Sequence, residues 1–272
     1  MTLSEAAGPA ASVQLDLLDP YDDAAVADVQ EFDEIVRAVD EPTQPPTLLR
    51  PTMGYLRHGW DGEPPRVWLH RRDGRVVGKI GLEIPERENR HTASVGVTVH
   101  PELRRRGLGT ALFHAAVERV REVDRRLLLA DSQDAEGPVA FARGLGFTQG
   151  SVEVRRRQDL SELDRTGIAR LHAEAEAMAQ GYSLLRFDGP VPDDLLEAVA
   201  AMSAAINDAP TDDLDIEDEA FDAERIRTFE RCTAAWGRRW YRLVARRDAD
   251  GKLAGHTFVA LDPEQPEWAY QY

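Results

Sequence analysis

Residues 95–109 carry more information about this chain than any other segment: Val-Gly-Val-Thr-Val-His-Pro-Glu-Leu-Arg-Arg-Arg-Gly-Leu-Gly. Apolar residues alternate over 95–99, which predicts a strand, and Pro101 ends it. A basic turn with Gly107 and Gly109 follows, and an amphipathic helix pattern begins directly behind it. The first turn of a helix has unpaired N–H groups and a partial positive charge, so it attracts phosphate. Glycines let the backbone close around a diphosphate, and arginines add charge-assisted contacts.

This pattern has a family counterpart. Arg104-x-x-Gly107-x-Gly109 after such a strand resembles the acetyl-CoA signature of the GNAT family of N-acetyltransferases, and Phe141-Ala-Arg-Gly-Leu-Gly-Phe147 resembles the family's second signature. The resemblance covers roughly residues 12–157. It implies an α/β (α+β) fold with a mixed, mostly antiparallel sheet flanked by helices. It also implies acetyl-CoA as co-substrate and a primary amine of a small molecule or protein as the acetyl acceptor.

Hydropathy patterns predict the element order of the first half, β-α-α-β-β-β-α-β-α-β. The Asp73-Gly74 pair is a strong hairpin signal between two apolar runs. The predicted strands and helices cover, in chain order, residues 12–18, 22–39, 47–60, 66–70, 75–84, 91–100, 109–123, 126–130, 138–144 and 151–155. This order is that of the GNAT fold.

The second half repeats the order more weakly. Residues 158–181 are charged and alanine-rich, which predicts a helical linker. The elements expected beyond it cover residues 182–187, 192–207, 222–236, 240–246, 253–261 and 268–272. We therefore expect a GNAT domain with an acetyl-CoA site over residues 1–157 and a partial second GNAT-like domain over 182–272. The second copy ends before its phosphate-binding motif, and it should leave an open sheet edge near residues 268–272.

The composition limits the classes of partner that we expect the chain to bind. The net charge of −16 argues against nucleic acid, and it suits a cationic amine or simply a soluble surface. No apolar run approaches the ~20 residues of a membrane span, and residues 1–12 carry no secretory signal. The single cysteine, Cys232, fits a reducing compartment. We expect a cytoplasmic protein with no membrane or nucleic-acid partner and no metal site; a homodimer is compatible with the sequence.

The resemblance assigns the co-substrate to two groups of residues. Backbone N–H groups along the basic turn would hold the diphosphate, with side-chain charge from the first and third arginines and the threonine hydroxyl in reach. These residues are Arg104, Arg105, Arg106, Gly107, Leu108, Gly109 and Thr110. Val97, Thr98 and Val99 should lie where the fourth strand splays from the fifth, and their backbone groups would meet the pantetheine and polarise the thioester carbonyl. Phe141 of the second signature completes the predicted binding set.

The catalytic residues are less clearly marked. Many family members carry a glutamate early in the motif strand, where this chain has Ser94. Glu83 and His91 are the nearest alternatives as general base, and we favour Glu83, acting directly or through water. Members often carry a tyrosine after the phenylalanine of the second signature to protonate the CoA thiolate; here it is Ala142. Ser132 or solvent would replace it. The missing tyrosine keeps open an alternative, a non-catalytic acetyl-CoA-binding regulatory or structural module.

Other chemistry-bearing residues are interpreted as structural. The acidic stretch 212–224 is expected to be a solvated loop with helix-capping carboxylates, or else to attract an amine. Trp236, Trp240 and Tyr241 fall in or next to predicted elements, so we expect them to pack in a core. Cys232 lies in a helix pattern and is expected to be buried rather than nucleophilic.

Overall fold

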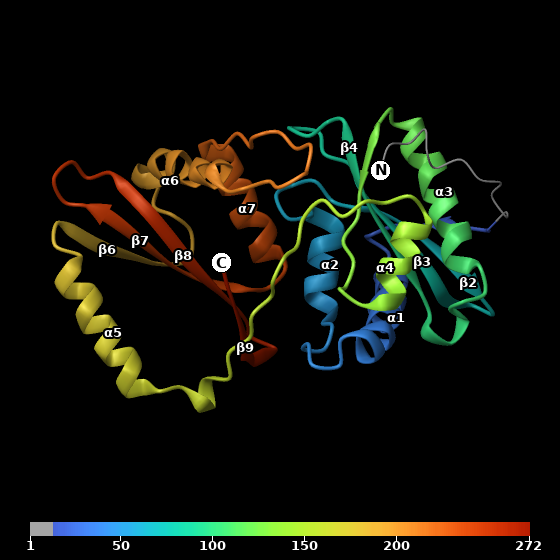
Figure 1. The fold of residues 1–272 in the computed structure, drawn as a ribbon, viewed down its shortest axis with the longest axis horizontal. Helices are drawn as coiled ribbons and strands as arrows, with labels where there is room; N and C mark the ends of the chain where they lie inside the picture. Colours follow the sequence, from blue (N-terminus) through green and yellow to red (C-terminus); the bar gives the residue numbers. More distant parts are fainter. Residues whose placement is uncertain (1–12) are drawn as a thin grey trace.

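The computed structural model describes residues 13–272, which form two sheets lying side by side along the long axis of the molecule (Figure 1). The first half contains β1 (Asp16–Leu17), α1 (Asp23–Asp40), α2 (Leu49–His58), β2 (Arg66–Arg72), β3 (Arg75–Glu83), β4 (Thr92–Val99), α3 (Leu108–Glu122), β5 (Leu127–Leu129) and α4 (Glu136–Gly144). The second half contains α5 (Arg165–Met178), β6 (Tyr182–Asp188), α6 (Leu196–Ser203), α7 (Ala223–Ala235), β7 (Arg239–Arg247), β8 (Leu253–Asp262) and β9 (Gln265–Gln271). Within these described residues, no helix is both long and apolar enough to cross a membrane.

The first sheet is mixed and mostly antiparallel, as expected. Its strand order is β1-β2-β3-β4-β5, and only the β4–β5 pair is parallel. The hairpin between β2 and β3 turns at Asp73 (φ 50°) and Gly74 (φ 79°), which confirms the turn predicted from that pair. The expectation of a GNAT-type sheet is confirmed in its order and direction.

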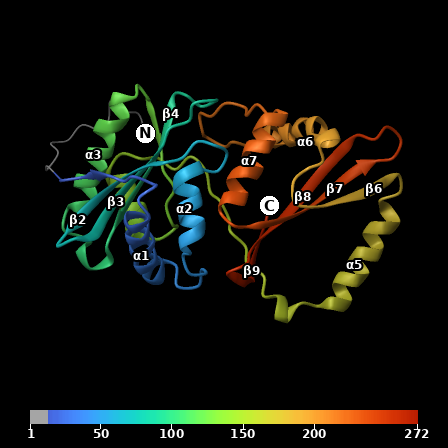
Figure 2. The same ribbon diagram turned by 180° about the vertical axis from the view of Figure 1, so that it is seen from behind.

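Helices cover both faces of this sheet. On one face, Leu112 and Phe113 of α3 are buried against Ile80 and Leu82 of β3. On the other face, α1 and α2 enclose a second core; its buried residues are Leu18, Val26, Val29, Phe32, Leu56, Val67, Leu69 and Val76. Figure 2, seen from behind, brings α1 and α2 to the front of the sheet. Each large apolar side chain buried in this way contributes about 1.5–3 kcal/mol.

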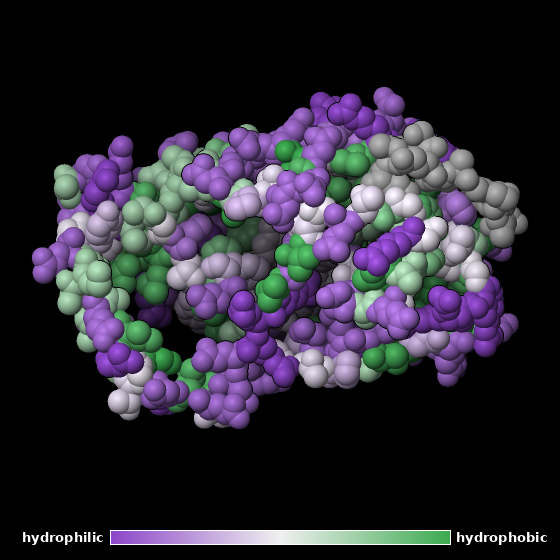
Figure 3. All heavy atoms as spheres, viewed as in Figure 1, coloured by the Kyte–Doolittle hydropathy of each residue, from purple (hydrophilic) through white to green (hydrophobic). Residues whose placement is uncertain are grey.

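The second sheet is antiparallel throughout, in the order β6-β7-β8-β9. Its α6–α7 side has a small core of Val191, Val199, Ala200 and Ile226. β9 lies at the edge, where an open edge was expected. Figure 3 shows apolar surface gathered over this half, and α5 contributes exposed Ile168, Leu171 and Met178 to it.

Four predicted elements differ from the structure. Residues 151–155 form no strand, since Val152 and Val154 are 64% and 67% exposed and no neighbouring strand pairs with them among residues 13–272. The first strand is reduced to β1, and residue 12 lies outside the described part. The helix predicted over 192–207 is α only within α6, with 3-10 turns on both sides. The fourth is the helix predicted over 22–39: its apolar pattern continues to Ile35, but in α1 the buried residues end at Phe32 and Ile35 is 39% exposed.

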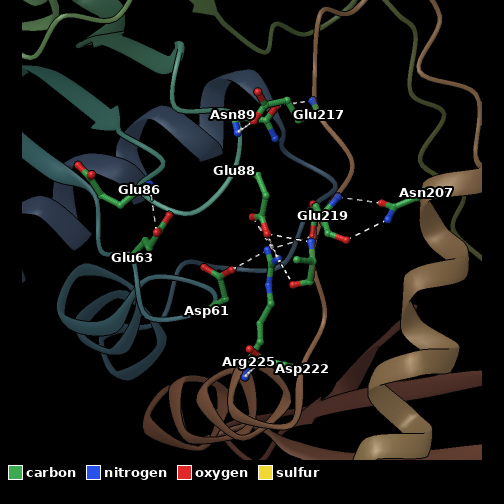
Figure 4. Close-up of polar contacts among 11 residues, drawn as sticks. Asp61, Glu63, Glu86, Glu88, Asn89, Asn207, Glu217, Glu219, Asp222 and Arg225 are labelled. Atoms are coloured by element: carbon green, nitrogen blue, oxygen red, sulfur yellow. Dashed lines mark hydrogen bonds and ion pairs between the residues drawn. The ribbon is translucent and has the colours of Figure 1, made fainter.

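Polar contacts between the two halves are drawn in Figure 4, and aromatic contacts such as that of Trp60 with Phe229 also join them. The guanidinium of Arg225 on α7 contacts three carboxylates, those of Asp61 (3.1 Å), Glu88 (3.1 Å) and Glu219 (3.0 Å). Asn89 exchanges two hydrogen bonds with the backbone and side chain of Glu217. The acidic stretch 212–224 therefore has two roles. Asp222 caps α7 by accepting a hydrogen bond from the Arg225 amide, and other acidic residues of the stretch contact the first half.

Candidate active site

The corner between β4 and α3 has an unusual backbone. Arg105 (φ 62°) and Gly107 (φ 82°) both adopt left-handed conformations, and Gly107 caps the start of α3. The first amide of the helix with an internal acceptor is that of Ala111, which donates to Gly107 O at 3.0 Å. The amides of residues 105–110 donate to no acceptor within residues 13–272. This run of unpaired N–H groups at a helix N-terminus is suited to an anion.

Space beside the corner is open on one side and filled on the other. A Cβ on Gly107 would meet nothing within 4 Å. A Cβ on Gly109 would lie 3.3 Å from Cζ of Phe141, because that ring packs directly against the helix start. Phe141 is therefore next to the predicted cradle, as the second signature implied, and it accounts for the small residue at position 109.

The signature arginines have different roles. The Arg104 guanidinium makes two hydrogen bonds to Asp40 at the end of α1 (2.6 and 2.7 Å), and its Nε donates to Val99 O at 3.1 Å. The sequence predicts that Arg104 reaches phosphate, but in the structure its side chain binds Asp40 and the Val99 carbonyl and so stabilises the corner. Arg105 and Arg106 are exposed and have no ion-pair partner within the described residues. Their charges remain for a ligand.

The expected splay between β4 and β5 is present. The ladder between them ends at the Ser94–Leu129 pair, whereas β4 stays paired with β3 as far as Val99. The His100 amide donates to Val77 O on the β3 side. Because peptide groups alternate along a strand, those of Val97 and Val99 face the open side and that of Thr98 faces β3. The open edge thus offers the backbone of Val97 and Val99, and not that of Thr98.

The favoured base has a partner that sequence reasoning missed. Glu83 ends β3 opposite Ser94, and its carboxylate accepts a hydrogen bond from the Tyr55 hydroxyl of α2. Burial, with the Glu83 contact as a second cause, raises the pKa of Tyr55 well above its usual range, so the phenol is a neutral donor. The Tyr55 ring meets Trp236 of the second half edge-on at 5.8 Å. No local pattern marks Tyr55, since the contact joins segments distant in sequence.

The other catalytic candidates have different surroundings. His91 Nε2 lies 3.0 Å from the backbone O of Asp215 and 3.6 Å from its carboxylate, so it takes part in the contact between halves. Exposed Ser132 donates to Gln133 O at 3.2 Å. Neither contact involves Glu83. Cys232 is buried, as expected, and burial raises the pKa of its thiol.

A family model described as "Acetyltransferase (GNAT) family" matches residues 32–147, which include the corner, the splay and Glu83. This part of the chain belongs to the GNAT acetyltransferase family. The match ends at Phe147, the last residue of the second signature. The GNAT domain thus contains every cofactor-binding and catalytic candidate named from the sequence.

Two relatives extend the comparison. Mycothiol acetyltransferase from Stackebrandtia nassauensis is 30% identical over 158 residues, 57% of this chain and 50% of that protein. The chain thus spans about half the length of this curated relative. A tandem GNAT protein from the clavulanic acid biosynthesis pathway, solved without acetyl-CoA, is 28% identical with a TM-score of 0.71, covering 96% of this chain and 78% of that one. The similarity to that tandem GNAT protein therefore extends over the second sheet as well as the first.

Proposed function

We propose that the GNAT domain transfers an acetyl group from acetyl-CoA to a primary amine. The observation that carries this proposal is the run of unpaired amides over residues 105–110 beside open space at Gly107. A diphosphate offers oxygens that such amides can bind, and Arg105 and Arg106 supply counter-charge. The free edge of β4 lies on the same strand that leads into this corner, which suits an extended ligand running from phosphate to thioester.

In the proposed reaction, the free amine attacks the thioester carbonyl. A C–N bond forms, the C–S bond breaks, the amine loses a proton and the thiolate gains one. The peptide N–H groups on the open side of β4, at Val97 and Val99, are the donors available to polarise the carbonyl. Ser132 or water returns the proton to the thiolate, since Ala142 supplies no hydroxyl.

Glu83 is proposed as the general base, with Tyr55 as its positioning residue. A carboxylate that accepts a hydrogen bond from a fixed phenol keeps one orientation, and its second oxygen stays available to an amine or a water. Tyr55 is itself packed against Trp236, so the second half contributes indirectly to the placement of the base. His91 is retained as the alternative base.

We further propose the division into a GNAT domain over residues 1–157, a linker over 158–181 and a second GNAT-like unit over 182–272. The two separate sheets support it. The chain as a whole is proposed to act in the cytoplasm on a small-molecule or protein amine. Its net charge of −16 argues against nucleic acid as a partner.

Release of CoA thiol from acetyl-CoA, measured across a panel of primary amines, tests the reaction. Amine-dependent release is the expected result. Binding of acetyl-CoA without such release would instead identify the chain as a non-catalytic acetyl-CoA-binding module.

Glu83→Gln tests the base. Removing the ionisable oxygen should lower the transfer rate about 10²-fold or more and flatten its dependence on pH. Tyr55→Phe should leave acetyl-CoA binding unchanged while lowering kcat more modestly, because only the orientation of Glu83 is lost. A wild-type pH profile in Glu83→Gln would exclude this residue as the base.

A further inference from the structure

Arg242 of β7 is a buried cation with no ion-pair partner in the described part of the chain. Its side chain lies on the face of the second sheet next to α7, and the residue is only 7% exposed. Its Nη1 is fully buried and has no hydrogen-bond partner, and no carboxylate in residues 13–272 lies within ion-pair distance of the guanidinium. Its packing contact is with the ring of Phe258, 5.5 Å from Cζ. Burying an unpaired charge is costly, so a chain seldom retains one without a use.

Arg225, in the same half, is a buried arginine with a structural role and serves as a comparison for Arg242. It is 8% exposed, almost the same as Arg242, yet its guanidinium contacts three carboxylates. The difference between these two residues is therefore not one of depth. Arg242 has the burial of a structural arginine, but among residues 13–272 it forms no ion pair; the nearby charge of Glu230 acts on it only from beyond ion-pair distance.

Arg242 also lines a cavity of about 240 Å³. The cavity is bounded by Asp188–Pro190 at the end of β6, by Phe229, Glu230 and Thr233 of α7, and by residues 238–242 at the beginning of β7. This volume is below the roughly 300–1,000 Å³ of most small-molecule pockets, which restricts it to a compact ligand. Phe229 and Trp240 supply apolar walls and lie 5.3 Å apart, ring to ring.

The charges and donors around the cavity favour an anion. Both of its carboxylates are already paired: Asp188 with Arg186 at 2.9 Å, and Glu230 with Arg227 at 2.6 Å. The second oxygen of Glu230 accepts from the Val191 amide at 2.7 Å. Two further buried donors lack acceptors, Nε of Arg238 and the indole N–H of Trp240. The residues that line this cavity therefore include three with buried N–H donors that lack acceptors, and both of its carboxylates already have ion-pair partners.

We propose that Arg242, Arg238 and Trp240 form a binding site for a small ligand bearing a carboxylate or phosphate group, between α7 and the beginning of β7. A guanidinium offers two parallel N–H groups to such an oxyanion, and the indole N–H adds a third donor. The aromatic walls suit a short apolar body behind the anionic group. This site lies in the second half, apart from the corner at Gly107, and does not depend on the proposed acetyl transfer.

Titration calorimetry of the whole chain in chloride buffer, with sodium benzoate and with inorganic phosphate, tests the site. The expected result is saturable binding of at least one probe beyond a potassium chloride control of equal ionic strength. Preference for benzoate would assign a carboxylate ligand, and preference for phosphate a phosphorylated one. Arg242→Gln should weaken binding at least about thirty-fold, because it removes one partner of a buried charged pair.

Arg170→Gln is the matched control, since it removes the same charge from an exposed pair on α5 and should bind like the wild type. Trp240→Phe keeps the aromatic wall but deletes the N–H donor, and should weaken binding about five-fold. In the absence of probe, Arg242→Gln should unfold at the same or a higher temperature than the wild type. Absence of saturable binding by the wild type, or equal binding by Arg242→Gln, would overturn the proposal.

Discussion

The three arginines of the phosphate signature differ in whether their charge is already paired within the structure. Arg104 belongs to the phosphate signature, yet its guanidinium is held by Asp40 and by Val99 O. Its neighbours Arg105 and Arg106 are the exposed ones. The motif thus uses its first arginine to stabilise the corner, whereas the next two form no ion pair with the residues that the structure describes.

Glu63 provides a test of residue electrostatics. Burial, reinforced by the nearby charges of Asp61 and Glu86, raises its pKa above 4.5, although the Glu86 amide donates to it at 3.1 Å (Figure 4). A carboxyl whose pKa is raised on folding binds its proton more tightly in the native state. Its contribution to stability is therefore greatest below its unfolded pKa and is lost as pH rises through its folded pKa.

Glu63→Gln removes the ionisable group, and with it the loss of stability at higher pH, while keeping an oxygen that accepts a hydrogen bond from the Glu86 amide. The variant should be more stable than the wild type at pH 7, with the difference vanishing near pH 4. Urea unfolding at several pH values measures it. Equal stabilities at pH 7 would show that Glu63 bears no folding penalty.

At the scale of elements, α2 and α7 approach each other at a glycine. A Cβ on Gly54 would lie 2.5 Å from Cδ1 and 2.7 Å from Cα of Trp236, and a backbone atom cannot easily move aside. Gly54→Ala should lower the free energy of unfolding by about 1–3 kcal/mol through overpacking, despite the better helix propensity of alanine. Because Trp236 packs on Tyr55, the variant should also lower the transfer rate.

The control for Gly54→Ala is Gly144→Ala in α4, where an added Cβ meets nothing within 4 Å. It should be neutral or slightly stabilising, by up to about 1 kcal/mol. Denaturant unfolding compares the two variants directly. A Gly54→Ala variant as stable as the Gly144→Ala variant would contradict the close approach of the two helices.

Elements with their own start and stop signals could be predicted from the sequence. Asp22 caps α1 through its side chain, and Asp73-Gly74 sets the β2–β3 hairpin. Residues 151–155 were mispredicted because a strand needs a partner, and alternation alone does not supply one. The Tyr55–Glu83 contact was missed for a related reason: it depends on how distant segments pack, which leaves no local pattern.

At the scale of the whole molecule, one cation among several acids lies at the contact between the halves. The chain carries a net charge of −16, and Arg225 gathers Asp61, Glu88 and Glu219 around itself. The side chains of Asp61 and Glu88 are only 22% and 17% exposed, so without the cation they would be left as neighbouring, poorly solvated negative charges. Arg225 therefore stabilises the contact between the halves.

Arg225→Gln should destabilise the chain by about 3–5 kcal/mol, the cost of leaving buried charges unpaired. Arg170→Gln removes an exposed pair and should change stability little. Chemical unfolding of both variants, followed by tryptophan fluorescence, compares them. A loss in Arg225→Gln no larger than that in Arg170→Gln would mean that the ion cluster does not hold the halves together.

The most direct measurement is the affinity for CoA of Gly107→Asp, compared by calorimetry with that of Gly74→Asp. Both glycines have nearly the same positive φ, 82° and 79°, and open space around the added Cβ, so the two variants carry equal backbone strain. Only Gly107→Asp places a negative charge among the unpaired amides of the corner. We predict binding weakened about a hundred-fold or more in Gly107→Asp and unchanged in Gly74→Asp. Wild-type affinity in Gly107→Asp would contradict the assignment of this corner to the diphosphate.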